Sequence, residues 1–127
     1  MNREIFEKLV SERFDTPLDR PFESDQSIVV FRHESNRRWF AVVMTIPKRL
    51  LGMHEDGKID IVNVKCAQEI IDSMWQEDGI YPAYHMSKAH WLTLALDGRV
   101  STDTLEWLLD ISYDLTRTKI TKRKSTK

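Results

Sequence analysis

The sequence predicts a small α+β domain, in which an antiparallel sheet of about five strands carries its helices on one face. Three observations predict this class. The 127 residues suit one domain, and 41% of them are hydrophobic, too many for a disordered chain. Segments with apolar residues at helical spacing alternate with short segments rich in β-branched residues. No apolar run approaches the ~20 residues of a membrane helix. The predicted order of elements, over residues 1–117, is α-β-β-β-α-β-β-α.

The first half of the chain contains one predicted helix and three predicted strands. Apolar side chains share one face of a helix over residues 3–14, and Asn2 can cap its start. Runs of β-branched residues predict strands at 27–33 and 38–46, which polar turn residues join into a hairpin. An Asp-Gly turn then leads into a third strand at 58–64.

The second half repeats the mixture of helices and strands. Helical spacing of apolar residues predicts a helix at 66–77, and a short strand is expected around 83–86. Residues 90–96 alternate as a strand and end in a second Asp-Gly turn. The last helix is predicted at 102–117, where polar residues at its start provide a cap.

Charge is distributed unevenly along the chain. Residues 116–127 hold six basic residues and no acidic one, so the remainder has 13 basic and 20 acidic residues, a net charge of −7. We expect residues 118–127 to form a basic, disordered tail. Such a tail is either simply solvated or adds salt-sensitive attraction to phosphates.

Motifs for catalysis or cofactor binding are missing from the sequence. It contains no glycine-rich phosphate loop, no Gly-x-Ser-x-Gly and no His-Glu-x-x-His. His85 and His90 flank a tight turn, which leaves metal binding open as a minor alternative, but no third ligand is evident. Cys66 is expected to be a small buried residue. The sequence therefore predicts a binding module without a cofactor rather than an enzyme.

The single cysteine also bears on the cellular compartment. It excludes an internal disulfide framework and suits reducing conditions. The first residues lack the apolar region of a secretory signal. We therefore expect a cytoplasmic protein that does not associate with membranes.

Basic residues cluster in the region of the first three strands. Between residues 32 and 65 there are seven basic and four acidic residues. Those at strand ends and turns are Arg37, Arg38, Lys48, Arg49 and Lys65. Hairpin tips that carry cations can contact a nucleic-acid backbone, although the same charges can also protect sheet edges from association.

The four tryptophans divide by predicted element. Trp75 and Trp107 lie on predicted helices and are expected in the core or half-buried. Trp39 and Trp91 lie on predicted strands, where they either pack against the sheet or stack on bases.

Several sequence motifs resemble those of a known family. Residues 79–91 are GIYPAYHMSKAHW, followed by Leu-Asp-Gly at 96–98. VNVKC at 62–66 and LLDISYDL at 108–115 belong to the same pattern. Through these motifs the chain resembles the YjbR/MmcQ family over nearly its whole length. Ser87 departs from the asparagine that many relatives carry at that place.

The resemblance implies a CyaY-like, or frataxin-like, fold and a role in DNA binding through a double-wing arrangement of β-hairpins. The family pattern maps onto Tyr84, His85, Met86, Lys88, His90 and Trp91, with Lys65, Ser112 and Tyr113 as further matches. Ser112 and Tyr113 are expected to face inward. The predicted DNA-binding residues are Arg37, Arg38, Lys48, Arg49, Lys65, Tyr84, His85, Lys88, His90 and Trp91.

Three functions remain open from the sequence. The first is DNA binding, and the second is a protein-interaction or small-ligand module that uses the sheet face or the region 84–91. The third is a metal protein that uses His85 and His90. A monomer is favoured. The DNA hypothesis requires that basic residues far apart in the sequence gather on one surface of the folded chain.

Overall fold

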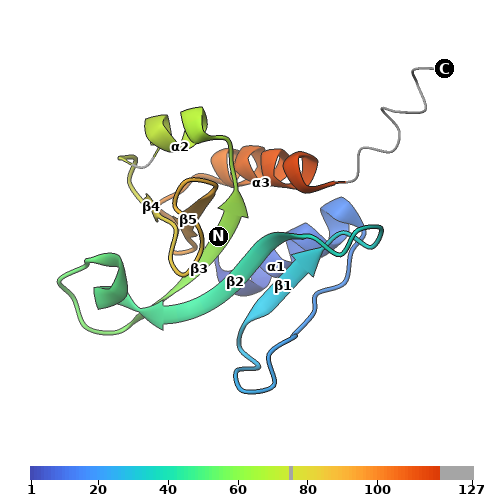
Figure 1. Ribbon diagram of the computed structural model, residues 1–127. Helices are drawn as coiled ribbons and strands as arrows, with labels where there is room; N and C mark the ends of the chain where they lie inside the picture. The colour runs from blue at the N-terminus through green and yellow to red at the C-terminus, as the bar shows by residue number, and fades with distance from the viewer. Residues whose placement is uncertain (75, 118–127) are drawn as a thin grey trace.

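The computed structural model describes residues 1–74 and 76–117. Five strands form one antiparallel sheet in the order β1-β2-β3-β5-β4, and three α-helices accompany it (Figure 1). The elements are α1 (Arg3–Phe14), β1 (Val29–Arg32), β2 (Trp39–Pro47), the 3₁₀ helix η1 (Lys48–Leu51), β3 (Lys58–Lys65), α2 (Gln68–Met74), β4 (Ile80–Pro82), β5 (Trp91–Ala95) and α3 (Thr102–Thr116). The predicted α+β class is confirmed. The basic segment 118–127 lies outside the described residues.

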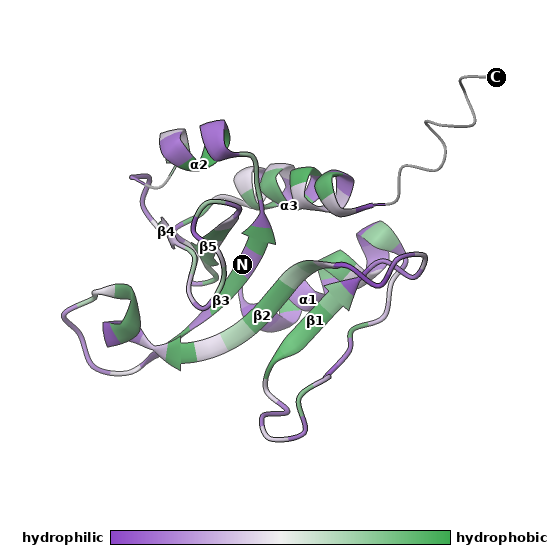
Figure 2. Cartoon of the chain, in the orientation of Figure 1, coloured by the Kyte–Doolittle hydropathy of each residue, from purple (hydrophilic) through white to green (hydrophobic). Residues whose placement is uncertain are grey.

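One face of the sheet packs against the helices. Alternate strand residues such as Val43, Val62 and Leu94 form a buried cluster with Phe6 of α1 and Leu108 of α3. Figure 2 shows the hydrophobic strands running through the centre of the molecule, beside helices with mixed faces. None of the helices in the described part of the chain is long and apolar enough to cross a membrane.

The opposite face, which we call the helix-free face, has its own smaller cluster. Val30, Val42 and Ile61 are buried there, and the half-buried side chains of Trp39 and Tyr84 pack against them. No helix of the three covers this face (Figure 1). Its cover comes instead from side chains of connecting segments.

A β-bulge changes the alternation at the start of β2. Phe31 of β1 pairs with Ala41, but the next residue, Arg32, pairs with Trp39, so Phe40 has no partner on β1. Phe40 and Ala41 both belong to the cluster on the helix side, whereas Trp39 packs on the helix-free face. One extra residue in a strand has this effect because side chains alternate between faces.

Three elements differ from the prediction. The helix expected at 66–77 is α2 at Gln68–Met74. The strand expected at 83–86 is instead β4, at Ile80–Pro82, and residues 83–86 belong to the connection to β5. Pro82 lacks a backbone N–H and therefore ends an edge strand. The structure also contains the 3₁₀ helix η1, which was not predicted from its short sequence of two basic and two leucine residues. Trp107 is 48% exposed, so the core or half-buried position expected for it is wrong, and Trp75 lies outside the described residues.

Candidate nucleic-acid interface

The tip of the β1–β2 hairpin is a compact turn closed by its own hydrogen bonds. The His33 amide donates to the Arg38 carbonyl at 2.9 Å, and the Arg37 amide donates to the His33 carbonyl at 3.0 Å. Arg37 has a φ of 65°, in the left-handed region. Asn36 Oδ1 accepts from the Arg38 amide at 2.9 Å. These bonds present Arg37 and Arg38 to solvent, and within residues 1–74 and 76–117 neither forms an ion pair.

The hairpin tip is fixed to the end of α3. Asn36 Nδ2 donates to the Thr116 carbonyl at 2.8 Å. His33 Nε2 lies 3.0 Å from the Tyr113 carbonyl and 2.8 Å from Thr116 Oγ1. Because the Tyr113 carbonyl can only accept, His33 carries its proton on Nε2. The chain therefore leaves α3 directly beside Arg37 and Arg38.

His33 sits in this junction as a neutral imidazole. Its side chain is buried against Phe40 and Tyr113, with ring centroids 5.2 Å and 4.3 Å away. Burial lowers the pKa of His33 below its usual value, and the positive charges of Arg117 and Arg38 act in the same direction. The Tyr113 carbonyl opposes them by accepting the Nε2 proton. Protonation of His33 would thus weaken the junction.

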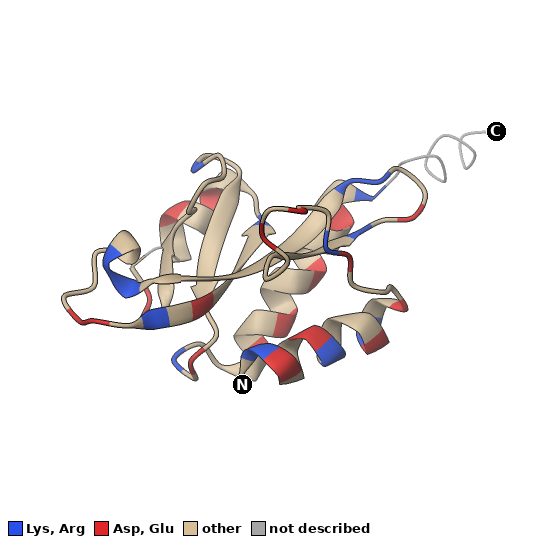
Figure 3. Ribbon diagram, turned by 90° about the horizontal axis from the view of Figure 1, so that it is seen from below, with Lys and Arg blue, Asp and Glu red and all other residues tan. Residues whose placement is uncertain are grey.

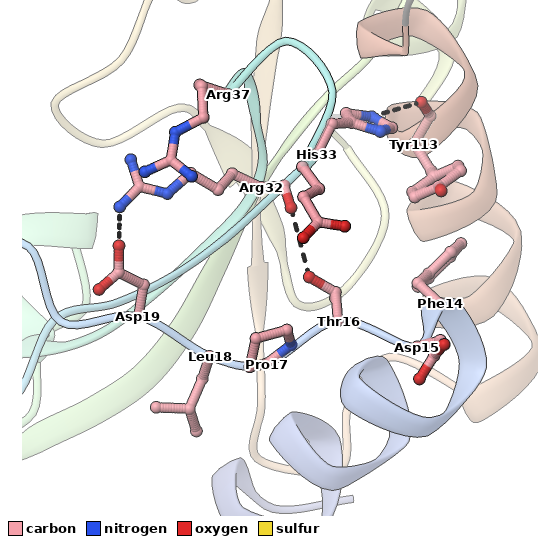
Figure 4. A pocket seen from close by; sticks show the side chains of 11 residues that line it. Phe14, Asp15, Thr16, Pro17, Leu18, Asp19, Arg32, His33, Arg37 and Tyr113 are labelled. Carbon is pink, nitrogen blue, oxygen red and sulfur yellow. Dashed lines mark hydrogen bonds and ion pairs between the residues drawn. The ribbon is translucent and has the colours of Figure 1, made fainter.

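A hollow of about 500 Å³ lies beside the hairpin tip. Figure 4 shows Arg32 and Arg37 entering it from the hairpin, with Phe14 and Tyr113 on the opposite side. Asp19 forms an ion pair with Arg32 in this hollow. Carboxylates and guanidinium groups are therefore mixed here, so the hollow itself offers no strongly positive pocket.

Lys65 and Trp91 are cross-strand partners. They pair at the end of β3 and the beginning of β5, and both are half-buried. Lys65 is two residues from Asn63, whose partner Thr93 is two residues from Trp91. Asn63 lies opposite Val42 of the helix-free face, so alternation directs Lys65 and Trp91 to that face.

The connection between β4 and β5 is attached to the sheet by a buried polar network. Asn63 Nδ2 donates to the Tyr84 carbonyl at 3.0 Å, and Thr93 Oγ1 accepts from the Tyr84 amide at 2.9 Å. Thr93 Oγ1 also donates to Asn63 Oδ1. Asn63 and Thr93 are fully buried. Tyr84 is therefore a half-buried anchor of this connection.

The remaining predicted residues of this connection are exposed. His85 has a φ of 61°, and its ring centroid lies 4.1 Å from that of Tyr84. Lys88 Nζ donates to the Ala83 carbonyl at 3.0 Å, which folds this side chain back over its own loop. His90 is exposed, and its carbonyl accepts from the Cys66 amide at 2.9 Å. A second hollow of about 340 Å³ lies between Lys88 and Leu50.

Lys48 and Arg49 lie far from the hairpin tip. β2 begins next to Arg38 and ends at Pro47, immediately before Lys48. Its nine residues span roughly 25–30 Å. Figure 3 shows basic residues at the hairpin tip and at η1 on opposite ends of the sheet. Lys48 is also paired with Glu55 at 2.8 Å. The structure therefore separates the predicted basic residues into two groups along the sheet, with Arg37 and Arg38 at one end of β2 and Lys48 and Arg49 at the other.

Comparisons with known proteins identify the family. The family model described as YjbR matches residues 14–115. The protein YyaQ of Bacillus subtilis is 34% identical over 117 residues, covering 92% of this chain and 99% of that protein. The chain belongs to the YjbR family. The protein YjbR of Escherichia coli K12 is 34% identical over 53 residues, which cover 41% of this chain and 45% of that protein.

Solved structures of similar chains have the same fold. A crystal structure of a Pseudomonas syringae protein has a TM-score of 0.90 and 38% identity, covering 92% of this chain and all of that chain. A Deinococcus radiodurans protein has a TM-score of 0.67 and 26% identity, covering 91% of this chain and 83% of that chain. The YjbR relationship therefore extends over most of the sequence and the architecture.

Two residues of the YjbR pattern have structural positions. Ser112 is fully buried, and its Oγ donates to the Phe40 carbonyl at 2.6 Å while accepting from the Lys65 amide at 2.8 Å. It thereby joins β2 to β3 beside the bulge. Tyr113 is half-buried, and its ring stacks on Phe14 with centroids 4.4 Å apart. Both residues were expected to face inward; Ser112 is fully buried, and Tyr113 is half-buried.

Residues that hold the candidate interface in place were missed in the sequence. Asn36 and Thr116 fix the hairpin tip, and Asn63 and Thr93 fix the β4–β5 connection. A signal was present for Asn63, because a polar residue inside an apolar strand requires a buried partner. The sequence contained no comparable signal for Thr116, whose partner is 83 residues away.

The surroundings of the candidate metal ligands and of the cysteine indicate neither a metal site nor a reactive thiol among the described residues. The described part of the chain contains no group of three or more His, Cys, Asp or Glu side chains arranged to hold a metal ion. Cys66 is buried, and burial raises the pKa of its thiol. A buried thiol with a raised pKa is a poor nucleophile, in agreement with the expected structural role.

Proposed function

We propose that this chain is a DNA-binding module that contacts phosphates with the tip of the β1–β2 hairpin. The observation that carries the proposal is the pair of exposed, adjacent guanidinium groups of Arg37 and Arg38 on a tip fixed to α3. Arginine is well suited to phosphate because its planar group donates several hydrogen bonds. A fixed tip also loses little conformational entropy when it binds.

The β4–β5 connection supplies the second wing of the proposed interface. It carries exposed His85, Lys88 and His90, and the buried network around Tyr84 attaches it to the sheet. Lys65 and Trp91 lie at its base. Contacts from two separate wings would fix the orientation of a nucleic acid, which a single basic tip cannot do.

The basic segment at the end of the chain strengthens the proposal. Residues 118–127 contain Lys119, Lys122, Arg123, Lys124 and Lys127. They follow Arg117, which is next to Thr116, the residue bonded by His33 and by Asn36 of the hairpin tip. The basic segment therefore begins close to the basic hairpin tip, although the two are far apart in the sequence. The proposal includes no catalytic step.

The test is the binding of a short fluorescein-labelled DNA duplex to the full chain, measured by fluorescence anisotropy over a range of salt concentrations. The logarithm of the binding constant should fall by about 0.9 for each phosphate contacted and each log unit of salt. The double variant Arg37→Glu, Arg38→Glu should bind at least about tenfold more weakly and reduce the slope by about two.

The matched control is Lys8→Glu, Lys58→Glu, which makes the same change in net charge. Lys8 is exposed on α1, and alternation turns Lys58 to the helix side of the sheet, because the next residue, Ile59, packs on the helix-free face. At about 0.1 M salt the Debye length is ~10 Å, so charges on the helix side are largely screened from the wings. The control should therefore keep an affinity within about twofold of the original chain. Equal weakening by both variants, or no duplex binding at low salt, would contradict the proposal.

A further inference from the structure

Two tryptophans and a lysine form a row across the helix-free face. Lys65 of β3 pairs directly with Trp91 of β5, and both side chains point to that face by alternation. On the other side of β3, the bulge gives Trp39 to the helix-free face and turns Phe40 toward the helices. We call Trp39, Lys65 and Trp91 the strand-end row, because all three lie where their strands begin or end.

The side chains of the strand-end row are more exposed to solvent than those of the next row on the same face. Its three members are half-buried, whereas the next row inward, formed by Val42, Asn63 and Thr93, is buried. The strand-end row therefore marks the edge of the packed interior on this face. In the parts of the chain that the structure describes, the Lys65 ammonium forms no ion pair.

The dimensions of the row are set by the sheet. Trp39 and Trp91 lie on strands that flank β3, so they are two strand spacings apart, about 10 Å. On the β2–β3 side of the row, Ser112 Oγ bridges the Phe40 carbonyl and the Lys65 amide. Lys65 thus lies on the strand between those of the two tryptophans. The exposed Arg38 precedes Trp39, whose ring meets that of Phe22 edge-on with centroids 5.9 Å apart.

We propose that the strand-end row is a platform for single-stranded nucleic acid, on which Trp39 and Trp91 stack on unpaired bases and Lys65 contacts a phosphate between them. This inference rests on the proposed DNA-binding function and names the form of nucleic acid that the site takes. In a duplex the bases are stacked on one another, so side chains on a sheet face cannot reach their planes. Aromatic rings interleaved with cations are the chemistry by which proteins hold single strands.

Charge decides against a protein as the first choice of occupant. Lys65 and the neighbouring Arg38 give the row and its border a positive charge without nearby ion-pair partners among the described residues. The hairpin tip and the β4–β5 connection, which border the row on its two sides, carry further basic residues. The phosphates of a nucleic acid can pair with Lys65 while its planar bases stack on Trp39 and Trp91. An apolar protein surface would leave the Lys65 charge unpaired.

The test compares the anisotropy of a labelled oligothymidylate single strand with that of the duplex used above. Trp39→Leu and Trp91→Leu should each weaken single-strand binding by about fivefold or more, because each removes one stacked base. Trp39→Phe and Trp91→Phe should retain most of the affinity. Trp107→Leu is the matched control, since Trp107 is 48% exposed on α3 and should have no effect.

A second measurement needs no substitution at the row. The indole N–H signals of the original chain are followed by ¹⁵N NMR during titration with the oligothymidylate, after assignment with the Trp→Phe variants. The signals of Trp39 and Trp91 should move, and that of Trp107 should not. If the Trp39 and Trp91 signals stay in place, the platform is wrong even if the leucine variants do not fold.

The outcomes separate the two proposals. Unchanged single-strand affinity in both leucine variants, together with weak duplex binding by Arg37→Glu, Arg38→Glu, would overturn the platform and leave the wing proposal intact. Failure of the original chain to bind the duplex at low salt would overturn the proposed function, and failure to bind the single strand would overturn the platform.

Discussion

Individual buried polar residues decide where the proposed site is held. Asn63, Thr93 and Ser112 are fully buried, and each has partners that satisfy its side chain. In the described residues, no buried side-chain nitrogen or oxygen lacks a hydrogen-bond partner. Removing one member therefore leaves a buried group without a partner, which costs more than the bond itself contributes.

His33 makes the stability of the molecule depend on pH. Its pKa in the folded state is below the usual 6.5, so the unfolded chain binds more protons near that pH. The free energy of unfolding should therefore fall as pH drops from about 7 towards 5. In urea titrations His33→Gln should show a smaller fall over this range, because glutamine does not titrate. Its amide can still donate to Thr116 and Tyr113, so the junction is kept.

The exposed His54 provides the comparison for this prediction. His54→Gln changes the number of histidines equally but lies away from the junction between the hairpin and α3. It should keep the pH dependence of the original chain. An identical pH dependence in all three proteins would show that His33 does not control stability in this range.

At the scale of elements, local signals predicted most bounds and failed where tertiary contacts decide. Asn2 caps α1 through a 2.9 Å bond from the Ile5 amide, and the expected range 3–14 is correct. β4 was displaced because its position depends on the partner β5 and on Thr93, which takes the Tyr84 amide out of the strand. The bulge at Phe40 has no local signal, and the Phe40 carbonyl accepts from Ser112 Oγ, which is 72 residues away in the sequence.

Ser112 joins two strands to a helix, and this contact can be tested. Ser112→Ala would leave the Phe40 carbonyl and the Lys65 amide without their partner in the core. The free energy of unfolding should fall by about 1–3 kcal/mol per unpaired group, measured by urea denaturation. Ser73→Ala on the exposed side of α2 should change it by less than about 0.5 kcal/mol. A stability loss equal to that of the control would show that water or backbone movement replaces Ser112.

At the scale of the whole molecule, the sheet places similar charges in different surroundings. The tip with Arg37 and Arg38 and the segment with Lys48 and Arg49 were equivalent in the sequence, yet they lie at opposite ends of β2. The strand predicted at 38–46 already placed the two pairs at its two ends, but the sequence did not show which other turns each end meets, because the order of strands in the sheet decides that. The pairing of Lys65 with Trp91 likewise required the order β3-β5.

The terminal basic segment gives a prediction at this scale. All five basic residues of 118–127 are replaced by glutamine in the full chain, which changes the net charge from −1 to −6. The salt dependence of duplex binding should become less steep by up to about 4.5, or 0.9 for each lost phosphate contact. An unchanged slope would show that the segment does not contact phosphates, whatever the effect of the hairpin variants.

The extra residue at Phe40 has a consequence for variation in this region. Upstream of it, odd-numbered and even-numbered positions of β2 exchange the sides they would occupy in a regular strand. Loss of Phe40 would make Trp39 the direct neighbour of Ala41 in regular alternation, so Trp39 would stay on the helix-free face. The ring contacts of Phe40 with Phe14 and Tyr113 would be lost. A one-residue change of length further along β2 would instead exchange the two faces of everything upstream, so changes there are tolerable only in steps of two, whereas the bulge itself can lose its extra residue without exchanging the faces.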